Sequence, residues 1–144
     1  MWRWRLKNTL SIVLALLLAV LVLGVLAIGG VDKFSKYGGN RVFYLDSQSS
    51  QSLQKKHLSV LEIFRVRGES VYLDGESENF VEGVLSDFAA QVLFEEEIDG
   101  VRSYYCFSPT LGEGIMVNGR KVNLHIAISD GGCALGSPII FGGF

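Results

Sequence analysis

The side chains best suited to specific chemistry in this sequence are two histidines and two cysteines. His125, Ser129 and Asp130 contain the residue types of a nucleophile, base and carboxylate set. However, neither a nucleophile elbow nor an oxyanion loop accompanies them. A histidine on the half-exposed polar side of a strand explains His125 as well. His125 is therefore a candidate binding residue, and an envelope hydrolase that uses it is an alternative function.

Cys106 and Cys133 lack the partner spacing of a zinc site, so the sequence predicts neither a metal nor another cofactor. The two residues could form a disulfide if the domain lies outside the cytoplasm. Two buried free thiols are the other interpretation, and the spacing does not decide between them.

Acidic and aromatic side chains cluster near residue 100. In a strand, successive residues of Glu95–Glu97 point to alternate faces, which indicates a solvated strand rather than a convergent site. Tyr105 and Phe107 are expected in the core, opposite Phe94. Tyr104 is expected to face outward, which makes it the second candidate binding residue, and no residue is predicted to be catalytic.

One helix and several strands must position these residues. Apolar residues at helical spacing predict a helix over residues 77–91, and they are Phe80, Val81, Val84, Leu85, Phe88 and Val92. Ser77 is the expected cap, and Gly83 is expected to allow close approach to a sheet. Strands are expected at residues 57–66 and 70–73, with residues 67–69 as the turn between them.

Two dipeptides of the type I′ class predict hairpins at Asp99-Gly100 and Asn118-Gly119. The first hairpin predicts five cross-strand pairs: Ile98–Val101, Glu97–Arg102, Glu96–Ser103, Glu95–Tyr104 and Phe94–Tyr105. Alternation predicts a strand over residues 121–129, and a last strand over residues 133–141 is expected to be an edge or bulged at Pro138. The fold class is α+β, with one helix packed on a mostly antiparallel sheet of about five or six strands. One face of that sheet is expected to be partly exposed to solvent or covered by a partner.

The N-terminal region predicts membrane attachment. Residues 8–31 carry no charge and would form a helix about 36 Å long, enough for a hydrocarbon core of about 30 Å. The flanking basic residues precede it: Arg3, Arg5 and Lys7. Because positive charge stays on the cytoplasmic side, we expect a cytoplasmic N-terminus and an extracytoplasmic domain. Cleavage as a signal peptide near residues 25–27 is the alternative, although the run exceeds the usual length of roughly 7–15 residues.

The expected organisation is a cytoplasmic tip and anchor at residues 1–31, a stalk and polar linker at 32–56, and an α+β domain at 57–144. The chain beyond the predicted anchor contains 10 basic and 15 acidic residues. Nucleic acids and anionic lipids both favour a basic face, so an acidic domain disfavours them as partners.

Residues 122–127 (VNLHIA) and 136–140 (GSPII) resemble the C-terminal part of small membrane-anchored proteins of spore-forming bacteria, the YwmB-like family. The resemblance covers roughly residues 70–144. It implies a helix on a curved sheet, related to the TATA-box-binding protein fold. DNA binding does not carry over, because the domain is acidic and expected outside the cytoplasm. The resemblance transfers no functional residue.

The sequence therefore predicts a membrane-anchored, non-enzymatic interaction module with a protein or cell-wall partner, acting at the cell envelope or in sporulation. A further alternative is a structural subunit that buries the solvent-exposed face of its sheet by self-association. The oligomeric state does not follow from the sequence.

Overall fold

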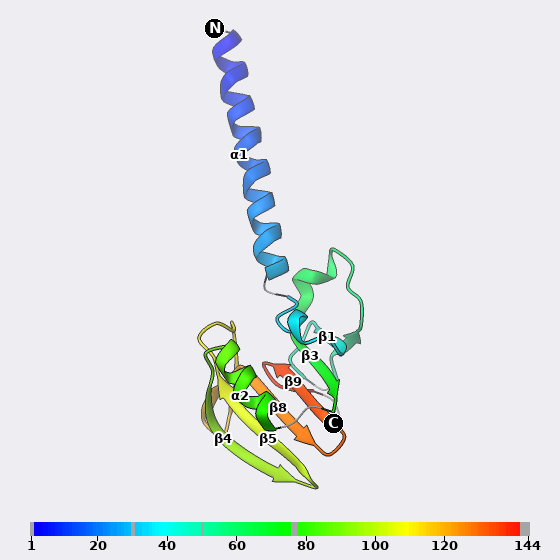
Figure 1. Ribbon diagram of the computed structural model, residues 1–144. Helices are drawn as coiled ribbons and strands as arrows, with labels where there is room; N and C mark the ends of the chain where they lie inside the picture. Colours follow the sequence, from blue (N-terminus) through cyan, green and yellow to red (C-terminus); the bar gives the residue numbers. More distant parts are fainter. Residues whose placement is uncertain (1, 30, 50, 76–77, 142–144) are drawn as a thin grey trace.

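The first element is a long isolated helix. The computed structural model describes residues 2–29, 31–49, 51–75 and 78–141. Helix α1 (Trp2–Gly29) projects away from the rest of the chain (Figure 1). Its window Thr9–Leu26 has a mean hydropathy of 3.0, and none of that window is buried. The helix is therefore long and apolar enough to span a membrane, as the sequence predicts.

A seven-stranded antiparallel sheet forms the body of the domain, in the order β2-β1-β3-β9-β8-β5-β4. The strands are β1 (Asn40–Leu45), β2 (Leu53–Lys55), β3 (Val66–Asp74), β4 (Gln91–Ile98), β5 (Val101–Phe107), β8 (Leu124–Ser129) and β9 (Gly132–Ser137). A separate hairpin joins β6 (Ile115–Val117) and β7 (Arg120–Val122). Two short 3-10 turns complete the fold, η1 (Ser35–Tyr37) and η2 (Glu62–Arg65). The predicted α+β class is confirmed, with more strands in the sheet than expected.

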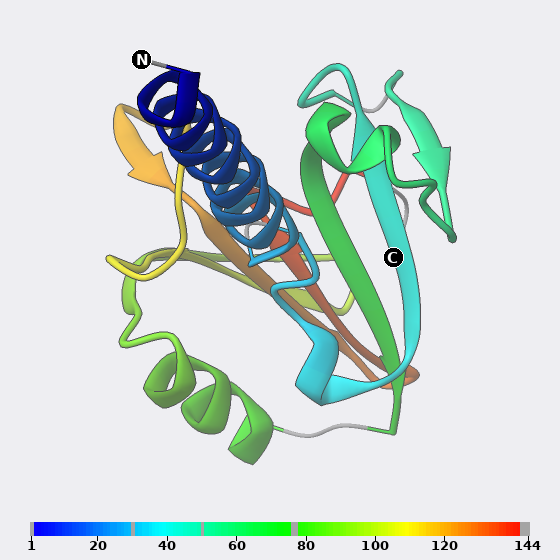
Figure 2. The same ribbon diagram turned by 90° about the horizontal axis from the view of Figure 1, so that it is seen from above.

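Helix α2 (Glu78–Asp87) covers one face of the sheet (Figure 2). Its buried side contains Val81 and Val84, as the helical spacing predicts, and Phe88 packs in the core just past its end. The helix ends at Asp87, four residues earlier than predicted, because Gln91 and Val92 belong to strand β4. The expected cap Ser77 lies outside the described residues. The expectation for Gly83 is wrong: Gly83 is exposed, and a Cβ there would meet no atom within 4 Å, because it lies on the solvent side of α2.

Both type I′ hairpins are confirmed. Each turn has two residues with positive φ, 51° at Asp99 and 80° at Gly100, then 49° at Asn118 and 75° at Gly119. The five predicted pairs of the first hairpin are all observed: Ile98–Val101, Glu97–Arg102, Glu96–Ser103, Glu95–Tyr104 and Phe94–Tyr105. Local turn chemistry was therefore sufficient to set this register.

Residues 57–69 differ from the prediction. The strand expected at 57–66 is an irregular segment that ends in η2, and the turn expected at 67–69 is part of the nine-residue strand β3. Gly68 does not turn the chain. A Cβ there would lie 3.1 Å from the Ser137 carbonyl oxygen, so the absence of a side chain lets the end of β9 pass close by.

The region expected to be a stalk and polar linker, residues 32–56, is largely part of the folded domain. Strand β1 lies between β2 and β3, and Phe34 is fully buried in the core. The Glu69 carboxylate on β3 accepts hydrogen bonds from the backbone N–H groups of Lys33 at 2.8 Å and Phe34 at 3.3 Å. The domain therefore begins just after α1, because a buried carboxylate holds the chain there.

The strand expected over residues 121–129 is divided at Asn123, which is fully buried rather than on a polar outer face. Its amide donates to the carbonyls of Ser108 at 2.8 Å and Leu111 at 2.7 Å, and its oxygen accepts from the Ser108 N–H at 2.7 Å. These bonds satisfy a loop that would otherwise bury unpaired backbone groups.

The last strand is interior rather than an edge. Strand β9 pairs with β3 on one side and β8 on the other. It ends at Ser137, one residue before Pro138, so the proline does not interrupt the ladder of hydrogen bonds.

Replacement of Phe34 tests whether the segment after α1 belongs to the core. We expect Phe34→Ala to lower the free energy of unfolding by about 3–5 kcal/mol, because the ring is fully buried against Phe88. Leu53→Ala is the control, since Leu53 is 51% exposed and should change stability by less than about 1 kcal/mol. Urea denaturation of the full chain in detergent measures both, and equal small effects would contradict the assignment.

Candidate functional site

The two neighbouring tyrosines of β5 occupy faces opposite to those expected. Tyr104 is 8% exposed and belongs to the core beneath α2, whereas Tyr105 lies on the other face of the sheet. The strand alternates as predicted, but both faces carry aromatic or apolar side chains. Only the position of α2 distinguishes them. Tyr104 is therefore not available as a surface binding residue.

A row of three rings crosses the second face of the sheet. Phe94 stacks on Tyr105 with ring centroids 4.5 Å apart, and Tyr105 stacks on His125 at 4.5 Å. The three residues lie directly opposite one another on β4, β5 and β8. Because the rings stack on each other, much of their face area is already in contact.

His125 is the most unusual member of this row. It is 8% exposed, and its Nδ1 accepts a hydrogen bond from the Ile140 backbone N–H at 3.3 Å. In the neutral ring the other nitrogen, Nε2, then carries the hydrogen. Nε2 is buried and has no hydrogen-bond partner among the described residues. Burial lowers the pKa of His125 to about 4, so the ring is neutral at pH 7.

A groove of about 410 Å³ runs along this row. It is lined by Glu96, Ile98, Val101, Ser103, Tyr105, His125, Ala127 and Ile140. Burial, together with the charge and hydrogen bonding of Glu96, raises the pKa of Tyr105. The groove thus combines apolar walls with a carboxylate, and one of its lining residues, His125, has a buried Nε2 without a partner among the described residues.

The C-terminal segment covers the neighbouring part of the same face. A Cβ on Gly136 would lie 2.5 Å from backbone atoms of Ile139 and Ile140, so these residues pass directly over β9. Phe141 packs edge-to-face on Tyr44 of β1 at 5.2 Å. The second face is therefore partly covered by the chain itself, and the groove is the part left open toward β4.

The set His125, Ser129 and Asp130 is not assembled as a triad. Ser129 is four residues along the same strand from His125, roughly 13 Å away, and its hydroxyl accepts from the Gly131 N–H in the turn. Within the described residues, no group of three His, Cys, Asp or Glu side chains could hold a metal ion. Glu95 to Glu97 are exposed, as expected for a solvated strand.

The disulfide interpretation of the two cysteines does not fit the fold. Cys106 on β5 lies opposite Leu124 of β8, whereas Cys133 on β9 lies opposite Ile128 of β8. The two cysteines therefore lie two strands apart, roughly 10 Å across the sheet, and are offset by four residues along it. This distance exceeds the Cα–Cα separation of about 7 Å that a disulfide can bridge. Both are buried thiols that form no disulfide. Burial raises the pKa of Cys106 to about 12, with the nearby Glu95 charge adding to the effect.

Residue types alone did not reveal the groove. The sequence predicts Phe94 and Tyr105 as core residues, and the hydrogen bond to Nδ1 of His125 depends on the chain end returning to supply the Ile140 N–H. The available signal was the register of the first hairpin, which already placed Phe94 beside Tyr105.

Comparison of the chain with family models, with curated proteins and with solved structures finds no match.

The buried histidine predicts a pH-dependent stability. The pKa of His125 is about 4 in the folded state against an ordinary 6.5, so the unfolded chain binds the proton more readily between these values. The free energy of unfolding should therefore fall by up to about 3 kcal/mol as the pH drops from 6.5 to 4. His125→Gln should remove this contribution, because glutamine can accept the Ile140 N–H but does not titrate.

The control for that experiment is His57→Gln, which makes the same substitution at an exposed position. Urea denaturation at several pH values measures all three chains. A slope in His125→Gln equal to that of the wild type would contradict the assignment.

The cysteines should be unreactive in the folded protein. We expect both thiols to resist alkylation by iodoacetamide in the native state and to react fully in urea without a reductant, because they are buried and do not form a disulfide. Mass spectrometry counts the adducts, and recovery of a disulfide-linked peptide would refute the prediction.

Proposed function

We propose that this chain is a membrane-tethered interaction module that binds a protein partner in the groove beside His125. The observation that carries the proposal is a buried histidine that lines an apolar groove and whose Nε2 donor has no partner within the described part of the chain. A buried unpaired donor costs free energy, in general about 1–3 kcal/mol, and a ligand that supplies an acceptor recovers that cost. A peptide carbonyl is an acceptor of the required kind.

The shape of the surface favours a protein over a cell-wall polymer. Tyr105 is stacked between Phe94 and His125, so both faces of this groove-lining ring are covered and neither is open for a sugar. Ile98, which is 64% exposed at its rim, extends the apolar surface. Aromatic and aliphatic side chains with few charges are typical of the centre of a protein interface.

The charges around α1 support the proposed location of the domain outside the cytoplasm. Arg3, Arg5 and Lys7 lie at the N-terminal end of α1, whereas the charges of Asp32 and Lys33 after its other end cancel, which favours a cytoplasmic N-terminus and an extracytoplasmic domain. The acidic domain carries 15 acidic residues against 10 basic ones, which disfavours nucleic acid as the partner. The resemblance to the YwmB-like family remains part of this proposal, with a role at the envelope or in sporulation.

Site-specific crosslinking tests the groove. A photoreactive amino acid at Ile98 of the full chain should capture a partner in intact cells, because this side chain lies at the groove rim. The matched control is the same group at Leu53, which is 51% exposed on the opposite edge strand β2. A second variant, Val101→Glu with the probe at Ile98, should reduce the adduct by placing a charge in the groove.

The identity of the adduct separates the alternatives. An adduct with a different protein, lost in the Val101→Glu chain, supports the proposal. An adduct containing two copies of this chain would support the structural-subunit alternative instead. Equal capture at Ile98 and Leu53, or capture no greater than by an α1-only chain, would contradict groove binding.

A further inference from the structure

The segment between β2 and β3 displays its apolar side chains to the outside. Val60 is 75% exposed, Leu61 79% and Phe64 58%. Single exposed apolar residues are common on protein surfaces, whereas several close together mark an interaction surface. These three residues lie within five positions of the chain.

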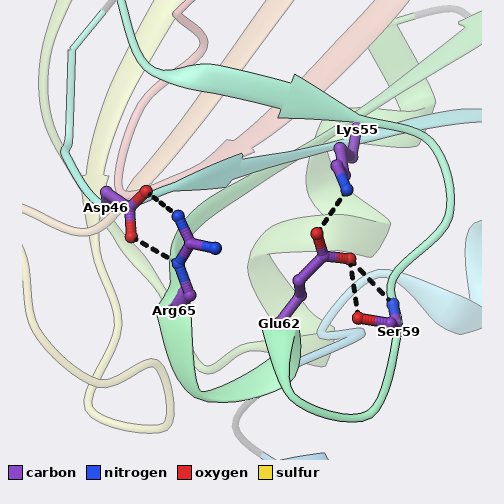
Figure 3. Close-up of polar contacts among 5 residues, drawn as sticks. All are labelled: Asp46, Lys55, Ser59, Glu62 and Arg65. Carbon is purple, nitrogen blue, oxygen red and sulfur yellow. Dashed lines mark hydrogen bonds and ion pairs between the residues drawn. The ribbon is translucent and has the colours of Figure 1, made fainter.

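The polar side chains of the same segment are used internally (Figure 3). The Glu62 carboxylate accepts hydrogen bonds from the Ser59 backbone N–H at 3.0 Å and hydroxyl at 2.9 Å, and it pairs with Lys55. These contacts, that of Lys55 foremost, lower the pKa of Glu62 to about 2. The Ser59–Glu62 pair resembles a capping box at the start of η2.

A second ion pair holds the other end of the segment. The Arg65 guanidinium donates to both carboxylate oxygens of Asp46 at the end of β1, with Nε 2.8 Å from Oδ1 (Figure 3). The Asp46 N–H also donates to the Arg65 carbonyl at 2.9 Å. The exposed apolar side chains are therefore presented by a segment with bonds at both ends.

This segment lies where α1 meets the domain. Helix α1 contacts η2, and in Figure 1 the segment rises beside the last turns of α1. A cleft of about 620 Å³ is lined by Val31 and Asp32, just past the helix, together with Lys56, His57 and Leu58. With α1 across a membrane, these residues lie at the membrane surface.

We propose that residues 56–64 form a membrane-contact loop, with Val60, Leu61 and Phe64 inserted into the leaflet from which α1 emerges. Apolar side chains lying at the boundary between headgroups and acyl chains remove their surface from water. The exposed Lys56 can keep its ammonium group at headgroup level while its stem lies against the acyl chains. The proposal rests on α1 crossing the membrane and is independent of the groove.

A second contact with the membrane would orient the domain. A single helix leaves the domain free to tilt about the chain that follows it, whereas a helix with an adjacent inserted loop limits that tilt. The β4–β5 hairpin lies at the end of the domain far from α1 (Figure 1). The groove rim at Ile98 would then be held away from the lipid and within reach of a partner.

Fluorescence quenching in the full chain tests the loop. Leu61→Cys is labelled with an environment-sensitive fluorophore and reconstituted into phosphatidylcholine vesicles with or without nitroxide-labelled lipid. The native thiols are buried, so the label enters at the introduced cysteine. We expect a blue-shifted emission that the lipid nitroxide quenches. Asp130→Cys, in the exposed turn between β8 and β9 at the far end of the domain, should show neither effect.

A double variant tests which side chains hold the loop in the lipid. Val60→Ser with Phe64→Ser should abolish the lipid quenching of the Leu61 label while α1 stays in the vesicles. Quenching of the Leu61 label by aqueous iodide alone would overturn the proposal. A blue shift that the lipid nitroxide does not affect would also overturn it, because such a shift indicates contact with protein instead of lipid. Failure of the whole chain to float with the vesicles would overturn the loop together with the anchoring on which it rests, and would leave the groove proposal standing.

Discussion

The buried carboxylate of Glu69 is the contact on which the arrangement of this molecule depends. It lies in β3 near the middle of the sheet and receives the backbone N–H groups of Lys33 and Phe34. Burial raises its pKa, while the two N–H donors act in the opposite direction by stabilising the charged form. Phe34 then packs edge-to-face on Phe88 next to α2, with ring centroids 5.6 Å apart. The segment that follows α1, the sheet and α2 thus meet at one place, and the folded domain begins within a few residues of the end of α1.

The two faces of the sheet are completed in different ways, and this difference creates the groove. Helix α2 covers one face with a continuous apolar stripe. The other face is covered by the returning chain end, where Gly136 leaves room for Ile139 and Ile140. The Ile140 N–H donates a hydrogen bond to Nδ1 of His125, whereas Nε2 has no partner among the residues that the structure describes. Native proteins seldom leave a buried donor unpaired, and such an exception is where a function is most reasonably sought.

Local patterns predicted the local structure well. The positive φ values required at Asp99-Gly100 and Asn118-Gly119 are met by residues that tolerate them, so both hairpins and the pairing of Phe94 with Tyr105 followed from a few adjacent residues. Predictions failed where a distant partner decides the outcome. Gly68 resembles a turn residue, yet it continues a strand because β9 passes close by. Residues 32–56 resemble a polar linker, yet they belong to the domain, because β1 pairs within the sheet and the Phe34 N–H donates a hydrogen bond to Glu69.

The sequence by itself determined the apolar helix able to span a membrane, the α+β class, α2 and the hairpin registers, because each depends on periodicity or turn geometry within a short segment. Only the tertiary structure decided which face of β5 is interior, why Cys106 and Cys133 are too far apart to pair, and how His125 is left with one unpaired nitrogen. These features depend on where α2 and the chain end pack. A strand with apolar side chains on both faces carries no local signal of which one will be covered.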